Sequence, residues 1–316
     1  MVNLKIHRST ILFSLTVFVI LISIVAAMRL FGVDKDYFEY LYFFQEVDFG
    51  YSGRFEPGFV LFTIFLKEIF GDFGIFLFFV AIVSLSIKFY LLSRLPYFFC
   101  WVVLYLAMFL FIHEMTQIRV ALAIAFGYWA LYSAYSGGRL LTRIILLIVA
   151  ACFQFSILIL IPFVVFWKSL SRPSAIFSLL IVLIPSGVLL AAGDTLSSFN
   201  PMVVGILESA EMQEVNPFSL KNVFLLFIAL IGFISLKKIP SRSVPWYYLS
   251  LMGLGLWYGL MEIPVFAHRL LEIAMLSYFF WIPYLPPRQR LLAMAILFLL
   301  GVYLLIYSFF ITPFFA

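Results

Sequence analysis

Residues 291–310 read LLAMAILFLLGVYLLIYSFF, and none of them carries a charge. An α-helix needs about 20 apolar residues to cross the hydrocarbon core of a bilayer. Residues 75–86 (IFLFFVAIVSLS) are of the same kind, and neither stretch alternates apolar with polar side chains as a transmembrane β-strand does. Such runs recur along a chain that is 65% hydrophobic and 11% charged, which excludes a soluble globule. The sequence therefore predicts an all-α, polytopic membrane helical bundle.

The apolar segments predict about 10 to 12 membrane helices in a single domain, including short or re-entrant ones. The segments are 10–28, 57–70, 74–92, 96–112, 117–135, 141–167, 174–192, 221–236, 245–262, 265–285 and 291–312. Segment 57–70 is short and ends in Lys67-Glu68, which favours a re-entrant helix. Segment 141–167 is interrupted at Phe153-Gln154-Phe155-Ser156, so we expect two short helices that form a hairpin.

The distribution of basic residues indicates the orientation of the chain, because Lys and Arg accumulate in short cytoplasmic loops. With a cytoplasmic N-terminus, 13 of the 20 basic residues fall on the cytoplasmic side: Lys5, Arg8, Lys88, Arg94, Arg139, Arg143, Lys168, Arg172, Lys237, Lys238, Arg242, Arg288 and Arg290. Residues 29–56 and 193–220 then form external loops. We expect a single site that is open to the exterior.

Two polar clusters lie among these apolar segments. The first runs from His113 and Glu114 through Gln117 to Arg119, and the second comprises Glu262, His268, Arg269 and Glu272. A charge at mid-bilayer costs about 2.5–3.5 kcal/mol on insertion scales, so such a cluster is a functional-site hypothesis.

The phase of an α-helix places the members of each cluster. His268, Arg269 and Glu272 share one face at 100° per residue. In the first cluster Arg119 points about 120° away from His113, whereas Glu114 and Gln117 share the face of His113. The structural alternatives are that Glu272 neutralises Arg269 or His268, and that Arg119 pairs with Glu56 or Glu262.

The two external loops differ in composition. Residues 29–56 combine acids, among them Asp34 and Asp36, with aromatic side chains such as Tyr37 and Tyr40. Aromatic faces and carboxylates suit a sugar, although an interfacial aromatic belt has the same composition. Residues 193–220 are acidic and fit either a mobile lid or a solvated connection.

Arg119 and Arg269 indicate an anionic ligand that arrives from the lipid. A guanidinium stays charged and matches phosphate oxygens with two parallel hydrogen bonds. The N-terminal dipole of the helix that follows Arg119 favours the same charge. A polyprenyl pyrophosphate has these properties.

Five motifs occur in order along the chain: Asp34-Lys35-Asp36-Tyr37-Phe38-Glu39-Tyr40, Arg54-Phe55-Glu56-Pro57-Gly58-Phe59, Gln117-Ile118-Arg119-Val120-Ala121-Leu122-Ala123, Phe153-Gln154-Phe155-Ser156, and Arg269. Over residues 34 to 272 the chain resembles the EpsG/Wzy-type polysaccharide polymerases. The family pattern has a histidine where this chain has Gln154, which leaves Gln154 a hydrogen-bonding role toward a sugar.

The resemblance implies an O-antigen or exopolysaccharide polymerase with a GT-C-like bundle. Such an enzyme lies in the bacterial inner membrane and transfers a growing glycan from undecaprenyl pyrophosphate onto a new lipid-linked repeat unit at the periplasmic face. Its expected partners are these lipid-linked oligosaccharides, membrane lipids and a chain-length regulator, with no nucleic acid.

Roles for individual residues follow from this resemblance. Arg119 and Arg269 would stabilise the leaving pyrophosphate. Glu56 or Glu114 would be the general base, with His113 and His268 as the next candidates. The residues expected to bind substrate are Asp34, Asp36, Tyr37, Tyr40, Arg54, Gln117, Gln154, Glu262 and Glu272. Asp34 and Asp36 form a D-x-D pair, but two carboxylates make a weak metal site, so we expect no cofactor and a metal-independent reaction.

Two other function classes remain open on the residues alone. A flippase or transporter of lipid-linked oligosaccharides would show an internal repeat and polar gates on both sides. A membrane acyltransferase that modifies glycans would use His113 or His268 as its base. The products separate the three classes, because they are a longer glycan, a translocated lipid and an ester respectively.

Overall fold

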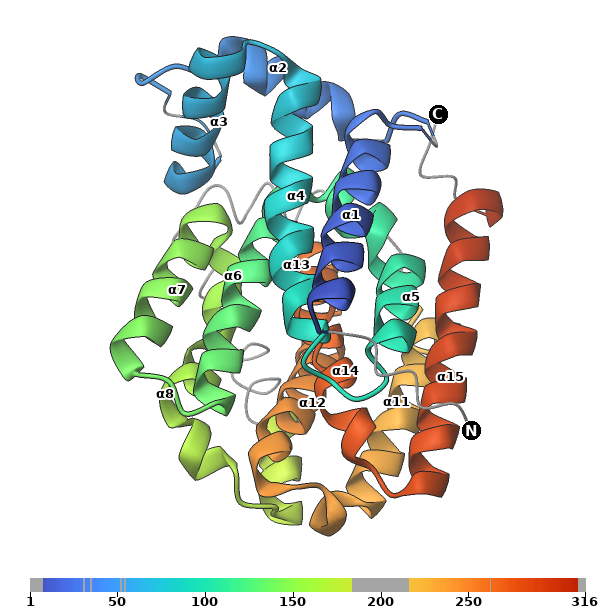
Figure 1. The fold of residues 1–316 in the computed structure, drawn as a ribbon. Coiled ribbons are helices and arrows are strands. Elements are labelled where there is room, and N and C mark those ends of the chain that lie inside the picture. The colour runs from blue at the N-terminus through green and yellow to red at the C-terminus, as the bar shows by residue number, and fades with distance from the viewer. Residues whose placement is uncertain are drawn as a thin grey trace. The chain divides into compact units, whose positions relative to one another are not determined.

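A computed structural model describes residues 8–30, 32–34, 36–51, 53, 55–183, 216–261 and 263–311. These described residues form helices and no strand, which confirms the predicted all-α class (Figure 1). In the first half of the chain the helices are α1 (Arg8–Ala27), α2 (Tyr37–Glu46), α3 (Pro57–Phe70), α4 (Phe73–Leu92), α5 (Phe98–Phe109), the π-helix η1 (Leu110–Thr116), α6 (Ile118–Tyr135), α7 (Leu140–Phe153), the 3₁₀-helix η2 (Phe155–Leu160) and α8 (Ile161–Leu170).

Residues 175–183 are also helical. After residue 216 the helices are α11 (Leu220–Ile234), η3 (Leu236–Lys238), η4 (Ser241–Ser243), α12 (Val244–Gly259), α13 (Pro264–Met275), α14 (Tyr278–Trp281), η5 (Ile282–Tyr284), α15 (Pro287–Ile306) and η6 (Tyr307–Ile311). The predicted external loop 29–56 therefore contains a helix, α2, and most of 193–220 lies outside the described residues.

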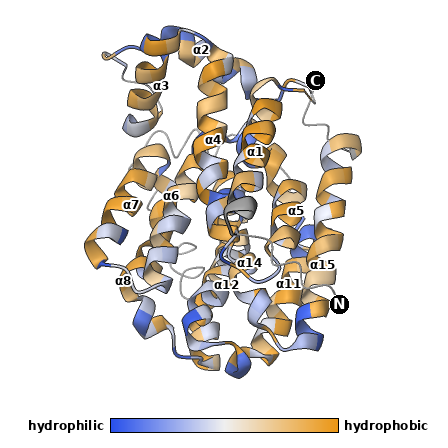
Figure 2. Ribbon diagram, viewed as in Figure 1, coloured by the Kyte–Doolittle hydropathy of each residue, from blue (hydrophilic) through white to orange (hydrophobic). Residues whose placement is uncertain are grey.

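Five helical stretches among the described residues are long and apolar enough to cross a membrane: Phe73–Leu92, Phe98–Thr116, Ile118–Tyr135, Pro264–Tyr284 and Pro287–Phe310. Apolar residues cover long stretches of these helices (Figure 2), and many large apolar side chains are exposed, such as Leu291 at 72%. Water would not tolerate so much exposed apolar surface, whereas lipid does. The protein is a multi-pass membrane protein.

Local signals set the bounds of the short helices. Pro57 occupies the first turn of α3, where its missing N–H costs nothing, and Gly71 ends the helix at a positive φ of 66°. The Asp72 carboxylate then accepts a hydrogen bond from the Ile75 amide at 2.8 Å and caps α4. The break predicted at 153–156 is also present, since α7 ends at Phe153 and a 3₁₀-helix follows.

One local prediction was wrong. The predicted span 96–112 continues to Thr116, but residues 110–116 are π-helical, and Gln117 leaves the helix with φ −98° and ψ 58°. The phase of 100° per residue that we assigned to residues 113–119 therefore does not apply.

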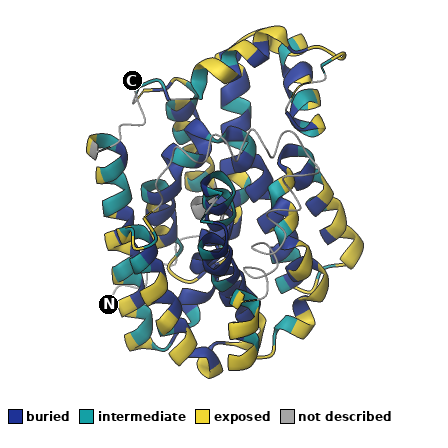
Figure 3. Ribbon diagram, turned by 180° about the vertical axis from the view of Figure 1, so that it is seen from behind, coloured by how far each residue is buried: buried dark blue, intermediate teal, exposed yellow. Residues whose placement is uncertain are grey.

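Residue packing groups the chain into two compact units. Unit 1 comprises 1–132, 144–155 and 304–316, and unit 2 comprises 133–143 and 156–303. In unit 1, α1 lies along α4, and the rings of Phe18 and Phe89 stack with centroids 6.1 Å apart (Figure 1). In unit 2, α12 is buried along nearly its whole length (Figure 3), and Trp246 stacks on Phe280 at 4.4 Å.

Candidate functional site

Arg119 and Glu56 form an ion pair in unit 1. Arg119 is the second residue of α6, and Glu56 immediately precedes Pro57 at the start of α3. The Arg119 Nη1 atom lies 2.5 Å from Glu56 Oε2, and the two side chains are 15% and 8% exposed. The guanidinium carbon lies 4.5 Å from the centroid of the Phe55 ring. Glu56 is thus an ion-pair partner of Arg119, and Glu262, the other acid predicted for a structural Arg119, lies outside the described residues.

The first four sequence motifs meet around this pair. Tyr40 of α2 packs against Phe55 and Phe59, with ring centroids 6.1 Å and 6.0 Å apart. Phe153 at the end of α7 lies 6.0 Å from Phe62 of α3 and stacks on Phe126 of α6 at 5.9 Å. Aromatic contacts thus join α2 and α7 to α3 and α6, the two helices that carry Glu56 and Arg119.

Gly58 allows α3 to approach α7 closely. A Cβ atom at Gly58 would lie 2.5 Å from the Cys152 Cβ and 2.8 Å from the Cys152 carbonyl oxygen. This contact is two residues from Glu56 on one side and two residues from Gln154 on the other. Gln154 is 6% exposed, and its Oε1 has no hydrogen-bond partner among the described residues. An amide oxygen held at this point can accept a hydrogen bond from a substrate hydroxyl.

Asp34 is held by a residue that the sequence did not single out. Its Oδ2 lies 3.1 Å from the Nε atom of Arg29, and the two side chains are 0% and 5% exposed. Burial raises the pKa of the Asp34 carboxyl, and the neighbouring Arg29 charge opposes that shift. The Asp36 amide donates to Asp34 Oδ1 at 3.1 Å, and the Arg29 guanidinium lies 5.8 Å from the Tyr37 ring centroid.

The proposed sugar-binding residues of this segment therefore differ in access. Asp34 is buried in its ion pair, whereas Asp36 and Tyr37 are half-buried. Within the described ranges, no group of three or more His, Cys, Asp or Glu side chains is placed to hold a metal ion.

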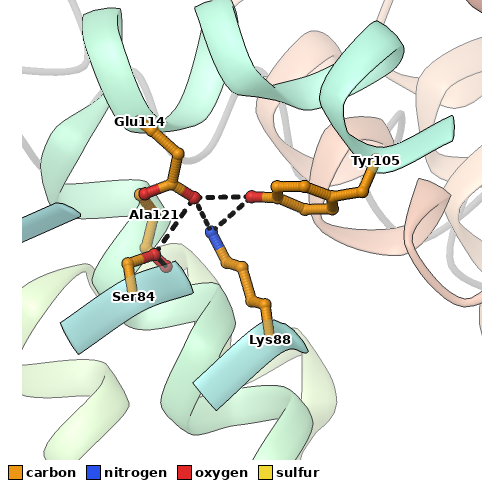
Figure 4. Close-up of polar contacts among 5 residues, drawn as sticks. All are labelled: Ser84, Lys88, Tyr105, Glu114 and Ala121. Atoms are coloured by element: carbon orange, nitrogen blue, oxygen red, sulfur yellow. Dashed lines mark hydrogen bonds and ion pairs between the residues drawn. The ribbon is translucent and has the colours of Figure 1, made fainter. Parts of the chain in front are cut away.

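Glu114 belongs to a buried polar network (Figure 4). Its Oε1 accepts hydrogen bonds from Lys88 Nζ at 2.6 Å, from the Tyr105 hydroxyl at 2.5 Å and from the Ser84 hydroxyl at 3.2 Å. The Lys88 and Glu114 side chains are both 0% exposed. Lys88, which the sequence analysis counted among the basic residues of the cytoplasmic side, lies inside α4, and its charge is paired with that of Glu114.

His113 lies beside this network and is fully buried. Its ring stacks on Phe109 with centroids 4.9 Å apart. Neither ring nitrogen has a hydrogen-bond partner among the described residues.

The second cluster lies in unit 2, on α13. His268, Arg269 and Glu272 are half-buried on this regular α-helix, as the sequence predicted. His268 Nδ1 lies 3.5 Å from the Nζ atom of Lys221, at the start of α11, and Glu272 interacts electrostatically with the same lysine. Lys221 is a cation that the sequence analysis did not assign to the cluster, because the contact joins residues 47 positions apart.

Arg269 forms no ion pair with another described residue, so the structural alternative in which Glu272 neutralises Arg269 is not found there. Two predicted site residues, Arg54 and Glu262, lie outside the described residues.

Comparison with known proteins gives the family. A family model described as the EpsG family matches residues 11–315. Searches of curated proteins and of solved structures each found no match. The family match confirms the resemblance seen in the motifs and supports a polysaccharide polymerase-type function in general. The helices, the motif-bearing ion pair and the match over nearly the whole chain lead to one conclusion, that this protein belongs to the EpsG family.

Proposed function

We propose that this protein is a membrane glycosyltransferase that polymerises polysaccharide repeat units. The donor is a growing glycan on undecaprenyl pyrophosphate, the acceptor is a new lipid-linked repeat unit, and the reaction takes place at the periplasmic face of the inner membrane. The observation that carries this proposal is the Arg119–Glu56 pair at the meeting point of four motifs. It combines a cation suited to pyrophosphate with a carboxylate suited to a hydroxyl group.

In the proposed reaction the acceptor hydroxyl attacks the anomeric carbon of the donor sugar. A new carbon–oxygen bond forms, the bond to the pyrophosphate oxygen breaks, and the hydroxyl proton passes to a base. Arg119 stabilises the negative charge that develops on the pyrophosphate. Attack in a single displacement inverts the anomeric configuration.

Glu56 is the base that the geometry favours. Glu56 and the pyrophosphate compete for the same guanidinium, so binding of the lipid substrate to Arg119 releases the carboxylate to accept the proton. Glu114 is less suited to this role, because its Oε1 already accepts three hydrogen bonds inside a closed network. His113 is enclosed beside that network, which also places it second to Glu56.

We assign the remaining residues by their surroundings. Asp36, Tyr37, Tyr40, Gln117 and Gln154 bind the glycan in unit 1. In unit 2, Arg269 binds a phosphate group, and His268 and Glu272 contribute hydrogen bonds. Each of these roles predicts lower polymer yield when the side chain is truncated.

Substitution of Arg119 tests the proposal. We expect Arg119→Ala to lower the rate of polymerisation about 100-fold or more, the typical effect of losing one transition-state donor. Arg119→Lys keeps the charge but loses the planar fork of donors, so it should recover activity only in part. The measurement is the ladder of glycan lengths in cells, together with turnover in nanodiscs supplied with lipid-linked repeat units.

Arg94→Ala is the matched control. Arg94 is exposed, and its side chain donates a hydrogen bond at 2.9 Å to the Tyr90 hydroxyl, away from the candidate site residues. This variant should polymerise normally. Long polymer in cells with inserted Arg119→Ala protein would refute the role of Arg119. Translocated lipid or new esters in place of longer glycan would indicate a flippase or an acyltransferase.

A further inference from the structure

The chain reaches Arg119 through an unusual turn. Residues 110–116 form a π-helix, in which the Gln117 amide donates to the Ile112 carbonyl at 2.7 Å and the Thr116 hydroxyl donates to the Phe111 carbonyl at 3.1 Å. Gln117 then leaves helical geometry, and α6 begins at Ile118. π-helical segments are rare and are found frequently at functional sites. The direction in which Arg119 projects therefore depends on what stabilises this turn.

The Glu114 network stabilises the turn from outside (Figure 4). Ser84 and Lys88 lie one turn apart on α4, and Tyr105 projects from α5, so three side chains from two helices converge on the Glu114 carboxylate of η1. Lys88 Nζ also donates to the Tyr105 hydroxyl at 2.9 Å. Each donor therefore has its partner within a network from which solvent is excluded.

Ser84 connects the π-helical turn η1 with the helix α6 that follows it. Its hydroxyl lies 3.2 Å from Glu114 Oε1 and 3.1 Å from the Ala121 carbonyl oxygen. Glu114 lies three residues before Gln117, and Ala121 lies four residues after it. A single α4 side chain thus contacts the Glu114 side chain of η1 and the Ala121 backbone of α6. Arg119 lies between these two residues in the sequence.

We propose that Ser84, Lys88, Tyr105 and Glu114 are positioning residues that hold the π-helical turn and thereby aim Arg119 at the pyrophosphate. This inference rests on the proposed function. A buried ion pair is a poor source of stability, because a well-packed apolar replacement is often as stable. What the pair adds here is a set of side-chain contacts from α4 and α5 that fix the position of the turn.

Two combined variants separate the possible roles of Glu114. In Lys88→Met/Glu114→Gln no charge remains unpaired, and the Gln carbonyl oxygen still accepts hydrogen bonds from Tyr105 and Ser84. In Lys88→Met/Tyr105→Phe/Glu114→Leu the three side chains become apolar. The hydrogen bonds that join Glu114 to α4 and α5 are then lost. Both variants, the wild type and Arg119→Ala are purified in nanodiscs. The measurements are insertion, thermal midpoint, kcat and KM with lipid-linked repeat units extracted from cells that lack this protein, and binding of undecaprenyl pyrophosphate.

A positioning role predicts a specific pattern. The variant Lys88→Met/Glu114→Gln should retain kcat within about threefold of the wild type. The apolar triple variant should insert and melt normally, yet lose about 30-fold or more in kcat and bind undecaprenyl pyrophosphate as weakly as Arg119→Ala, because a small displacement of a binding group is costly. If the triple variant does not insert, Ser84→Ala replaces it, with an expected loss in kcat of about three- to tenfold.

Each of three results would overturn either the positioning role or the proposed function. Wild-type kcat in the triple variant beside an inactive Arg119→Ala would refute only the positioning role. An inactive Met/Gln variant would make Glu114 a base or an essential charge rather than a positioning residue. Full activity in Arg119→Ala would refute the proposed function itself, on which the positioning role depends.

Discussion

Three ion pairs are enclosed within the described part of this protein. Arg29 meets Asp34, Lys88 meets Glu114, and Arg119 meets Glu56. Only the third pair retains measurable exposure on both side chains and carries two motif residues. Under the proposed function, partial exposure lets the Arg119 guanidinium exchange its carboxylate partner for a substrate, whereas the two more deeply buried pairs serve the structure.

The Arg29–Asp34 pair leads to a prediction on pH. Burial raises the pKa of Asp34, and the Arg29 charge limits the rise. In Arg29→Met that limit is removed, so the folded-state pKa of Asp34 rises further above its value in the unfolded chain. The stability of the variant is then fully present below the unfolded pKa and is lost as the pH rises through the folded pKa.

We therefore expect Arg29→Met to melt close to the wild type at about pH 4 and well below it at about pH 7.5, with about 3 kcal/mol or more lost by the unpaired carboxylate. Thermal midpoints in detergent across this range are the measurement. The double variant Arg29→Met/Asp34→Asn should show a smaller deficit that does not change with pH. A deficit of Arg29→Met that grows toward acid pH would contradict the assignment.

At the level of helices, three of the first four motifs lie at the ends of the short helices α2, α3 and α7, and the fourth lies at the start of the long helix α6. α3 is a 14-residue helix whose start abuts the end of α7, with Gly58 against Cys152. The sequence predicted both the length of α3 and the break after α7, because Pro57, Gly71 and the polar residues at 154 and 156 are local signals. It did not predict the contact between them, which depends on how the two helices pack.

This close approach can be tested at Gly58. A methyl group there would overlap the Cys152 side chain and carbonyl oxygen, so Gly58→Ala should separate α3 from α7 and cost about 1–3 kcal/mol. We expect a lower thermal midpoint and reduced polymer length. Gly74→Ala is the control, because its Cβ would meet only the Asp72 carboxylate, at 3.1 Å. Unchanged stability and activity in Gly58→Ala would show that the contact has no role.

At the scale of the whole molecule, the distribution of basic residues predicts the orientation. It places η4 on the cytoplasmic side and the segment after α2 outside. In a Cys100→Ser/Cys152→Ala background, we expect Gly50→Cys to react with a membrane-impermeant maleimide in spheroplasts. Ser241→Cys should react only after the membrane is permeabilised. The reverse pattern would invert the orientation and place Glu56 and Arg119 away from the periplasm.

The sequence by itself determined the class of the protein and most helix bounds, and it supplied the candidate site residues. Apolar runs, Pro57, Gly71 and the polar break at Gln154 act locally, and so they can be read without knowing how the helices pack. Only the tertiary structure decided that Lys88 pairs with Glu114, that Arg29 pairs with Asp34, and that Lys221 lies beside His268. The same holds for the π-helix at residues 110–116. The physical reason is that the low dielectric of the membrane interior requires each charge to have a partner, but only the packing of distant helices selects that partner.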